Sequence, residues 1–159
     1  MKIIIVDNDV VINDKIKLSP SEKKIDVMKD FCWEDWLKYN DQVISFRIKL
    51  DGDIKCEGDI YLIVTFTYPV SDDSILKSWV LAPEKLIEGT QKKPEGKVTK
   101  RLRQWFFDKT GTYLPMAGEW GNIDVTYDHW NCVGMIFCNY RAGFLSESDW
   151  MQYRKRSGF

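Results

Sequence analysis

The sequence predicts an α+β fold: a single domain in which three or four helices pack on a mostly antiparallel sheet of five to seven strands. Three observations favour this class. Residues 43–50 alternate apolar and polar side chains with a period of two, and residues 60–68 form a nearly continuous apolar run. The segments of strand character gather in the early and late parts of the chain, whereas a doubly wound fold would alternate strands with helices.

The first thirty residues predict short strands and one ambiguous segment. Strands are expected at 2–6 and 10–12, because both segments are β-branched and Asp7-Asn8-Asp9 between them supplies turn residues. Residues 15–18 form a further short extended piece. Residues 24–28 alternate apolar and polar side chains after a helix-capping sequence, so helix and strand are both open there.

The next segments predict a helix and two strands. Residues 30–39 are expected to be helical, because Asp30 is a suitable N-cap and aromatic residues crowd two sides of the turns that follow. Residues 43–50 form a half-buried strand, and Asp51-Gly52-Asp53 is a turn sequence. The apolar run of residues 60–68 suits a strand at the centre of the sheet, and a proline ends it.

Two more helices are expected in the middle of the chain. The first opens at Ser71 with acidic residues in its first turn and breaks near Pro83. Residues 89–96, which read GTQKKPEG, predict an exposed loop and not a domain boundary, because each half of the chain is too small for a full core. Residues 97–109 form an amphipathic helix with apolar side chains at i, i+4, i+7 and i+8.

The last part of the chain predicts a β-hairpin and a C-terminal helix. Residues 122–127 and 132–140 have strand character, and the residues between them form the turn. Ser146 caps the last helix, in which acidic residues come first and basic residues last. The side chains expected to form one core between sheet and helices are Ile44, Phe46, Ile48, Leu62, Val64, Phe66, Leu102, Trp105, Phe106, Val133 and Phe137.

Size and composition fit one domain that spans all 159 residues. With 44% hydrophobic and 30% charged side chains, the chain can bury a core and is not disordered as a whole. The N-terminal apolar run covers only residues 3–6, which is shorter than the apolar region of a secretory signal, and no window reaches the length of a membrane span. We therefore expect a cytoplasmic protein without membrane contact, whose four cysteines stay reduced.

Charge is divided unevenly along the chain. Residues 1–91 contain 12 basic and 17 acidic side chains, a net charge of −5, and residues 92–159 contain 11 and 7, a net charge of +4, which together give the −1 of the whole chain. Solvated helix faces would explain the basic segment 92–103. Nucleic-acid binding would also explain it, with Trp105 and Phe107 available for stacking. The near-neutral total and the place of Trp105 in the apolar stripe of its helix speak against nucleic acid.

No catalytic or cofactor-binding pattern stands out in the sequence. His129 is the only histidine, and its place in a hairpin turn makes it a poor preorganised base. The paired acids have local explanations in turns and helix caps, and the glycines form neither a dinucleotide-binding nor a phosphate-binding loop. The sequence therefore predicts no enzyme, no cofactor and no metal site, with a small hydrolase as an alternative.

Residues 102–141 read LRQWFFDKTGTYLPMAGEWGNIDVTYDHWNCVGMIFCNYR, which gives a helix, a Tyr-Leu-Pro loop and then a hairpin that ends in an aromatic residue. This order resembles the small immunity proteins that bacteria encode beside polymorphic or contact-dependent toxins. The resemblance lies in the order of these elements, and it carries over no functional residue. It implies a non-catalytic, protein-binding module that binds one cognate toxin tightly in the cytoplasm and needs no cofactor.

The acidity of residues 1–91 favours a basic toxin as the partner, for example a nuclease whose phosphate-binding cations would meet carboxylates. A charged turn projects beyond a sheet, and tryptophan is a frequent interface anchor. The predicted partner-binding residues are Asp51, Asp53, Glu57, Asp59, Trp33 and Trp36. A plain solvated turn and the burial of at least one tryptophan are the structural alternatives. The functional alternative is a nucleic-acid-binding, phage or plasmid accessory protein that uses residues 92–103.

Overall fold

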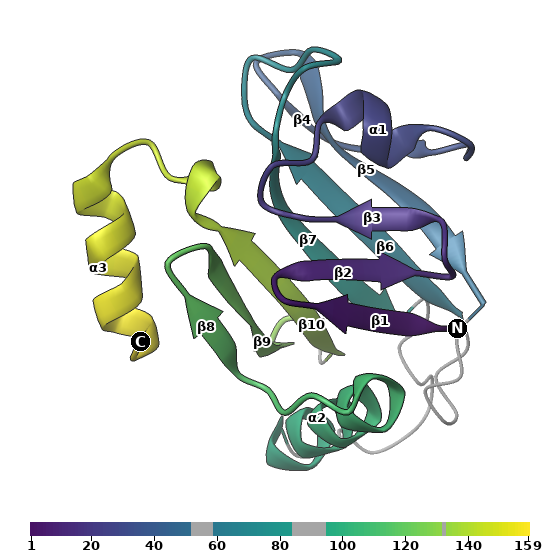
Figure 1. The fold of residues 1–159 in the computed structure, drawn as a ribbon, viewed down its shortest axis with the longest axis vertical. Coiled ribbons are helices and arrows are strands. Elements are labelled where there is room, and N and C mark those ends of the chain that lie inside the picture. Colours follow the sequence, from purple (N-terminus) through teal and green to yellow (C-terminus); the bar gives the residue numbers. More distant parts are fainter. Residues whose placement is uncertain (52–58, 84–94, 132) are drawn as a thin grey trace.

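The computed structural model describes residues 1–51, 59–83, 95–131 and 133–159, which form two antiparallel sheets with helices around them (Figure 1). The small sheet contains β1 (Ile3–Val6), β2 (Asp9–Ile12) and β3 (Ile16–Leu18). The large sheet contains β4 (Glu34–Tyr39), β5 (Gln42–Leu50), β6 (Ile60–Phe66), β7 (Leu76–Pro83), β8 (Met116–Gly118), β9 (Gly121–Asp128) and β10 (Val133–Tyr140). The helices are α1 (Lys24–Met28), α2 (Glu95–Thr110), α3 (Glu147–Ser157) and the 3₁₀ turn η1 (Arg141–Gly143). The predicted α+β class is confirmed.

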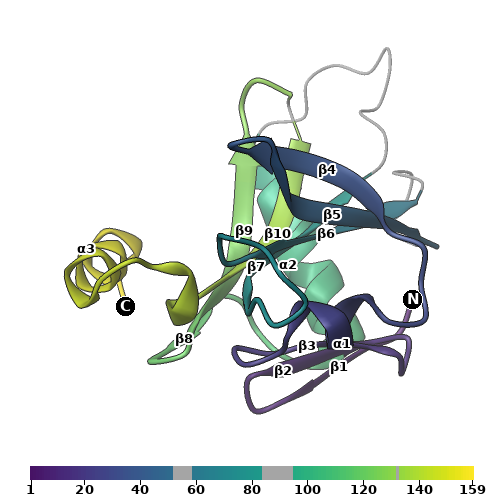
Figure 2. The same ribbon diagram turned by 90° about the horizontal axis from the view of Figure 1, so that it is seen from above.

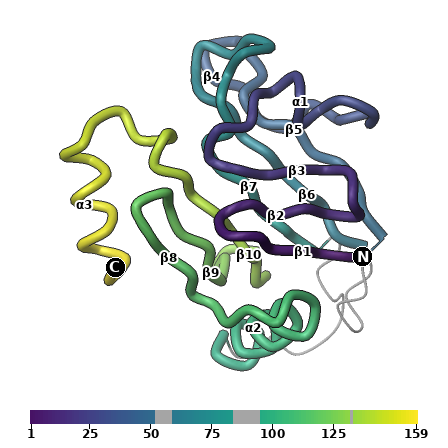
Figure 3. The backbone as a smooth tube through the Cα atoms, in the orientation of Figure 1, coloured from purple at the N-terminus to yellow at the C-terminus, as the bar shows by residue number. Residues whose placement is uncertain are grey.

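The large sheet joins two meanders. Its strand order is β4-β5-β6-β7-β10-β9-β8, and each neighbouring pair is antiparallel. The strands β4 to β7 follow one another along the chain, as do β8 to β10, and the two sets meet where β7 pairs with β10 (Figure 3). This junction places Ile136 opposite Leu81, so residues far apart in the sequence share the centre of the sheet.

The core lies between the two sheets and α2. The small sheet stacks on one side of the large sheet (Figure 2) and buries one side chain in two along β2 and β3. Helix α2 packs along β9 and β10 on the same side and buries its apolar stripe, which includes Leu102. Gly134 on β10 permits this close approach, because a Cβ there would lie 2.5 Å from Val98 Cγ1 and 2.6 Å from Leu102 Cδ1.

One hydrogen-bonded aromatic pair is buried inside this core. Trp79 on β7 donates its Nε1–H to the hydroxyl of Tyr140 on β10 at 3.0 Å, which satisfies the indole group away from water. Cys138 lies buried nearby, and this burial raises the pKa of its thiol, so the thiol stays protonated and inert. The thiol of Cys32 is exposed, although free cysteines are usually buried, and Cys56 and Cys132 lie outside the described residues.

The predicted helix over residues 30–39 is wrong, because residues 34–39 form the edge strand β4. The helix prediction relied on Asp30 as N-cap, but Asp30 has φ +67°, a left-handed conformation, whereas an N-cap residue is extended. Pairing with β5, with Glu34 opposite Arg47, supplies the backbone hydrogen bonds that a helix would have made internally. A bulge at Trp36 obscures the period of two in the sequence.

The predicted helix from Ser71 to Pro83 is also wrong. Residues 71–74 form a turn in which Ser71 N–H donates to Ser74 Oγ at 2.8 Å, and β7 follows. Trp79 and Leu81 alternate with less buried neighbours along β7, which is paired on both sides, with β6 and β10. Tertiary pairing thus overrides the helix-capping signal of the acidic residues.

Apart from the short strand β8, which lies in a stretch expected to be a loop, and the turn η1, the other elements agree with the sequence in type. The short strands near the N-terminus, the strands at 43–50 and 60–68, the hairpin and the helices α2 and α3 are confirmed, and residues 24–28 are helical. Ser146 caps α3 by accepting the Asp149 N–H at 3.1 Å. Of the expected loop at 89–96, the last two residues already belong to α2 and the others lie outside the described residues.

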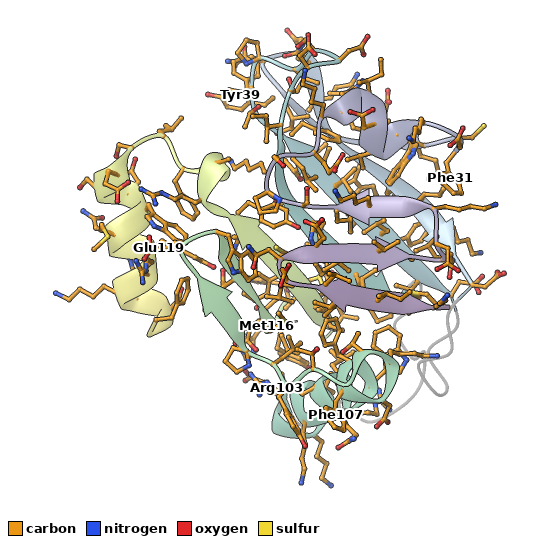
Figure 4. The ribbon with its side chains drawn as sticks, viewed as in Figure 1. Phe31, Tyr39, Arg103, Phe107, Met116 and Glu119 are labelled. Atoms are coloured by element: carbon orange, nitrogen blue, oxygen red, sulfur yellow. The ribbon has the colours of Figure 1, made fainter. Side chains whose placement is uncertain are left out.

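Helix α3 is attached to the hairpin side of the large sheet by polar contacts. The Tyr153 hydroxyl donates to Asn122 Oδ1 at 2.7 Å and accepts from Asn139 Nδ2 at 3.0 Å. Glu119 forms ion pairs with both Arg141 and Arg154, and Figure 4 shows it between β8 and α3. Trp150 is buried among aromatic side chains of the same C-terminal segment.

The predicted core is confirmed in most of its members and wrong in three. Phe46, Leu62, Val64, Phe66, Leu102, Trp105 and Phe106 belong to it, and Ile48 packs against it. Ile44 is half-buried and is not among the residues that form the core or pack against it. Val133 and Phe137 instead point to the other face of β10, because Gly134, Ile136 and Cys138 take the inner positions. Strand β10 is apolar on both faces, so its alternation does not reveal which face is inward.

Candidate functional site

The side of the large sheet that faces away from the small sheet carries an unusual row of side chains. Backbone registers align Glu34, Arg47, Ile63, Val80, Phe137 and Asp124 in one row across β4, β5, β6, β7, β10 and β9. The three central members are apolar and half-buried, and the two ends are acidic. We call this side the outer face.

Arg47 on the outer face contacts three neighbouring side chains. Its guanidinium carbon lies 4.2 Å from the ring centre of Trp36 and 4.4 Å from that of Tyr61, so the cation sits between two aromatic rings. Its Nε–H donates to Glu34 Oε2 at 2.8 Å. Stacking and ion pairing together fix the orientation of a side chain that would otherwise be mobile in solvent.

The predicted acidic residues only partly join this group. Asp59 forms an ion pair with Lys49 at 3.1 Å, next to Arg47 on the outer face of β5. Asp51 is exposed directly after β5, and Asp53 and Glu57 lie outside the described residues. The structure therefore brings Asp59 and Trp36 to one face, with Asp51 at its border.

The two predicted tryptophans separate. Trp33 is half-buried and packs against the core, whereas Trp36 on β4 is 44% exposed above Arg47. The expectation that at least one tryptophan would be buried is met only in part, because Trp33 is half-buried. Only Trp36 presents a substantial ring surface to a partner.

The end of the β9–β10 hairpin carries a third tryptophan, Trp130, which is 96% exposed. The Asp128 carboxylate accepts a hydrogen bond from the backbone N–H of Trp130 at 2.9 Å. It also accepts hydrogen bonds from the backbone nitrogen and the side-chain nitrogen of Asn131. These hydrogen bonds, those from Asn131 first, lower the pKa of Asp128, so it stays a carboxylate near neutral pH. His129 pairs with Glu95 of α2 at 3.4 Å, which links this turn to the start of the helix.

In the described part of the basic segment, one cation is paired and both aromatic side chains are engaged within the protein. Arg103 forms an ion pair with Asp124 at 3.1 Å, and Trp105 is buried in the core as expected. Phe107 stacks on Tyr113 with ring centres 4.2 Å apart, so it is already partnered, and Figure 4 shows Arg103 and Phe107 on α2. A shallow cavity of about 400 Å³ beside them is lined by Lys100, Arg103, Gln104, Phe107, Tyr113 and Leu114.

The described residues show no arrangement of a hydrolase. His129 is exposed in a turn, and the Cys132 that could have accompanied it lies outside the described residues. Among the residues with described positions, no three His, Cys, Asp or Glu side chains come together as a metal site. No helix within the described ranges has the length and apolar character needed to cross a membrane.

Sequence reasoning missed three side chains of this surface: Arg47, Tyr61 and Trp130. Arg47 was visible as a polar member of the alternating strand, but its aromatic neighbours come from strands whose pairing the sequence did not specify. Trp130 gave a usable signal, since a tryptophan in a hairpin turn has no core to enter.

Comparisons with known proteins identify the family. No curated protein matches the sequence. A solved structure described as "Rhs1-CT in complex with cognate immunity protein RhsI1" contains a chain that is 38% identical to this one, with a TM-score of 0.83 and 98% of each chain covered. The model of the family described as RhsI1 immunity protein matches residues 1–159. The chain therefore belongs to the RhsI1 immunity protein family.

Proposed function

We propose that this chain binds the toxic C-terminal domain of one cognate Rhs protein and neutralises it. The observation that carries the proposal is the match over 98% of both chains to a solved structure of an Rhs C-terminal domain with its cognate immunity protein. The surface described above supports it, because Trp, Tyr and Arg are the residue types that anchor protein interfaces. Neutralisation then needs only tight binding and no chemistry by this chain.

Co-expression tests this function. The probe is the C-terminal domain encoded by the open reading frame upstream of the gene for this chain, identified by sequencing the locus and produced in a sensitive bacterial strain. We expect this chain to restore growth, and an unrelated immunity protein produced at the same level to have no effect. Persistent growth arrest in the presence of folded chain would contradict the proposal.

Titration of the purified proteins separates binding from catalysis. If this chain acts by binding, inhibition of the toxin is complete only when one chain is present per toxin domain. Complete inhibition at a small fraction of that ratio would show turnover and would contradict the non-catalytic function. The cytoplasmic location inferred from the sequence stays a prediction.

The acidic segment that follows β5 in the sequence provides a second prediction, which rests on a basic toxin. In the double variant Asp51→Lys with Asp53→Lys, we expect association with the toxin to slow about tenfold at low salt, because steering by opposite charge is lost. The difference shrinks at physiological ionic strength, where the Debye length is about 8 Å.

A control for this experiment carries the same charge change elsewhere. Asp72 and Asp73 are two exposed acids in the turn before β7. The variant Asp72→Lys with Asp73→Lys should associate faster than the Asp51 and Asp53 variant at low salt. Equal association rates of the two variants would exclude Asp51 and Asp53 from the binding site and leave the proposed toxin binding itself intact.

A further inference from the structure

We propose that the toxin docks on the outer face of the large sheet, on a surface that runs from Trp36 on β4 to Trp130 at the end of the β9–β10 hairpin. This inference rests on the proposed function and names the surface that performs it. The apolar centre of the surface is Ile63, Val80 and Phe137, and Arg47 is its oriented cation.

The first argument is that the outer face carries apolar side chains that the core does not use. Val80 and Phe137 are direct neighbours across β7 and β10, and Ile63 is the neighbour of Val80 on β6. All three are half-buried, although the small sheet and α2 both cover the opposite face. Apolar side chains on a second face stabilise the fold little when water still reaches them, and such patches mark interaction sites.

The second argument concerns the two exposed tryptophans at the borders of this face. The hairpin end that carries Trp130, like β4, lies on the side of the large sheet away from the small sheet (Figure 2). Trp130 is 96% exposed, yet its backbone is fixed by Asp128, and Trp36 is fixed by its stacking on Arg47. The ring of Trp36 is already oriented and the backbone of Trp130 is already fixed, so both lose less conformational entropy on binding than mobile residues would, which favours affinity.

The third argument identifies the partner as a protein. Three cations that reach this face are already paired in the described part of the chain: Arg47 with Glu34, Lys49 with Asp59, and Arg103 of α2 with Asp124. A nucleic acid needs cations that neutralise phosphates, so internal pairing disfavours it. A protein with an apolar centre and a polar rim matches this distribution, and the family makes the cognate toxin domain the occupant.

The chemistry of Arg47 specifies what the toxin presents. Among the described residues, only its Nε–H is hydrogen-bonded, to Glu34, and the rings of Trp36 and Tyr61 hold the guanidinium plane. Its terminal N–H groups can donate to a carboxylate or a carbonyl oxygen of the partner. The toxin surface should therefore combine an apolar patch with an acceptor oxygen at the point that faces Arg47.

The test measures the affinity of purified variants for the Rhs C-terminal domain encoded beside the gene for this chain. We expect Trp36→Ala and Trp130→Ala each to weaken the toxin affinity at least tenfold, as interface hot spots do. The control is Leu145→Ala, since Leu145 is 99% exposed before α3 and lies off the outer face. Its affinity should stay within about twofold of the unmodified chain, as surface substitutions outside an interface do.

Two results would overturn the inference. Unchanged affinity of both tryptophan variants, with the unmodified chain binding normally, would place the toxin elsewhere while the proposed function stands. Weakened affinity of Leu145→Ala with unchanged tryptophan variants would place the toxin at the α3 side. If the unmodified chain does not bind the toxin, the proposed function fails, and the inference fails with it. Thermal unfolding of each variant confirms that the fold is intact.

Discussion

Replacing Leu102 with alanine should lower the free energy of unfolding by about 2–5 kcal/mol, the range for large-to-small changes in a packed core. Leu102 is 1% exposed and lies where α2 approaches Gly134 on β10. Neither the helix nor the strand can close the cavity without losing other contacts. Urea unfolding followed by far-ultraviolet circular dichroism measures the loss.

The matched control for this change is Leu145→Ala, which removes the same atoms from a solvated position. We expect it to change the free energy of unfolding by less than about 0.5 kcal/mol. A loss below about 1 kcal/mol for Leu102→Ala would contradict the packing of α2 on β10, because such a small effect is typical of an exposed site.

Replacing Gly121 with alanine should destabilise the protein by about 3 kcal/mol or more, because backbone strain of about 1–3 kcal/mol adds to a direct clash. Gly121 begins β9 with φ +148°, a conformation that other residues rarely adopt. A Cβ at this position would lie 2.2 Å from the carbonyl oxygen of Asn139 and 3.0 Å from Tyr140 Cα. Both are backbone atoms of β10, so no side chain can move aside.

Gly111 supplies the comparison for this variant. It also has a positive φ, +69°, but an added Cβ would meet nothing within 4 Å. Gly111→Ala should therefore cost only the conformational strain of about 1–2 kcal/mol. Thermal and chemical unfolding should show that the Gly121→Ala variant is clearly less stable than the Gly111→Ala variant. The reverse order would contradict the close approach of β9 and β10.

The fold could be predicted where local pattern and tertiary structure agree. The alternating strand at residues 43–50 and the amphipathic helix α2 follow from the order of their side chains. Strands β4 and β7 could not be predicted, since a helix-start signal precedes each of them. The signal is Asp30 before β4 and Ser71 before β7. Their strand conformation comes from pairing with strands that the sequence does not identify as neighbours.

The candidate site could be predicted only in outline. Trp36 and Asp59 follow from the idea that exposed acids and aromatic residues bind a partner, and the structure places both on the outer face. The position of Arg47 between two rings needs the registers of three strands, which no single segment encodes. The outward position of Phe137 was hidden by the apolar character of both faces of β10.

Strand β10 places two different demands on alternate positions of one segment. Its even-numbered residues from Gly134 to Tyr140 face the core, where contacts with α2 and Trp79 restrict the size and shape of their side chains. Val133, Met135 and Phe137 are free of that constraint. Within a lineage of such chains, these three positions can thus diverge faster than the even-numbered ones. On the proposed docking surface, a new binding preference can then arise at Val133, Met135 and Phe137 while the scaffold is inherited unchanged.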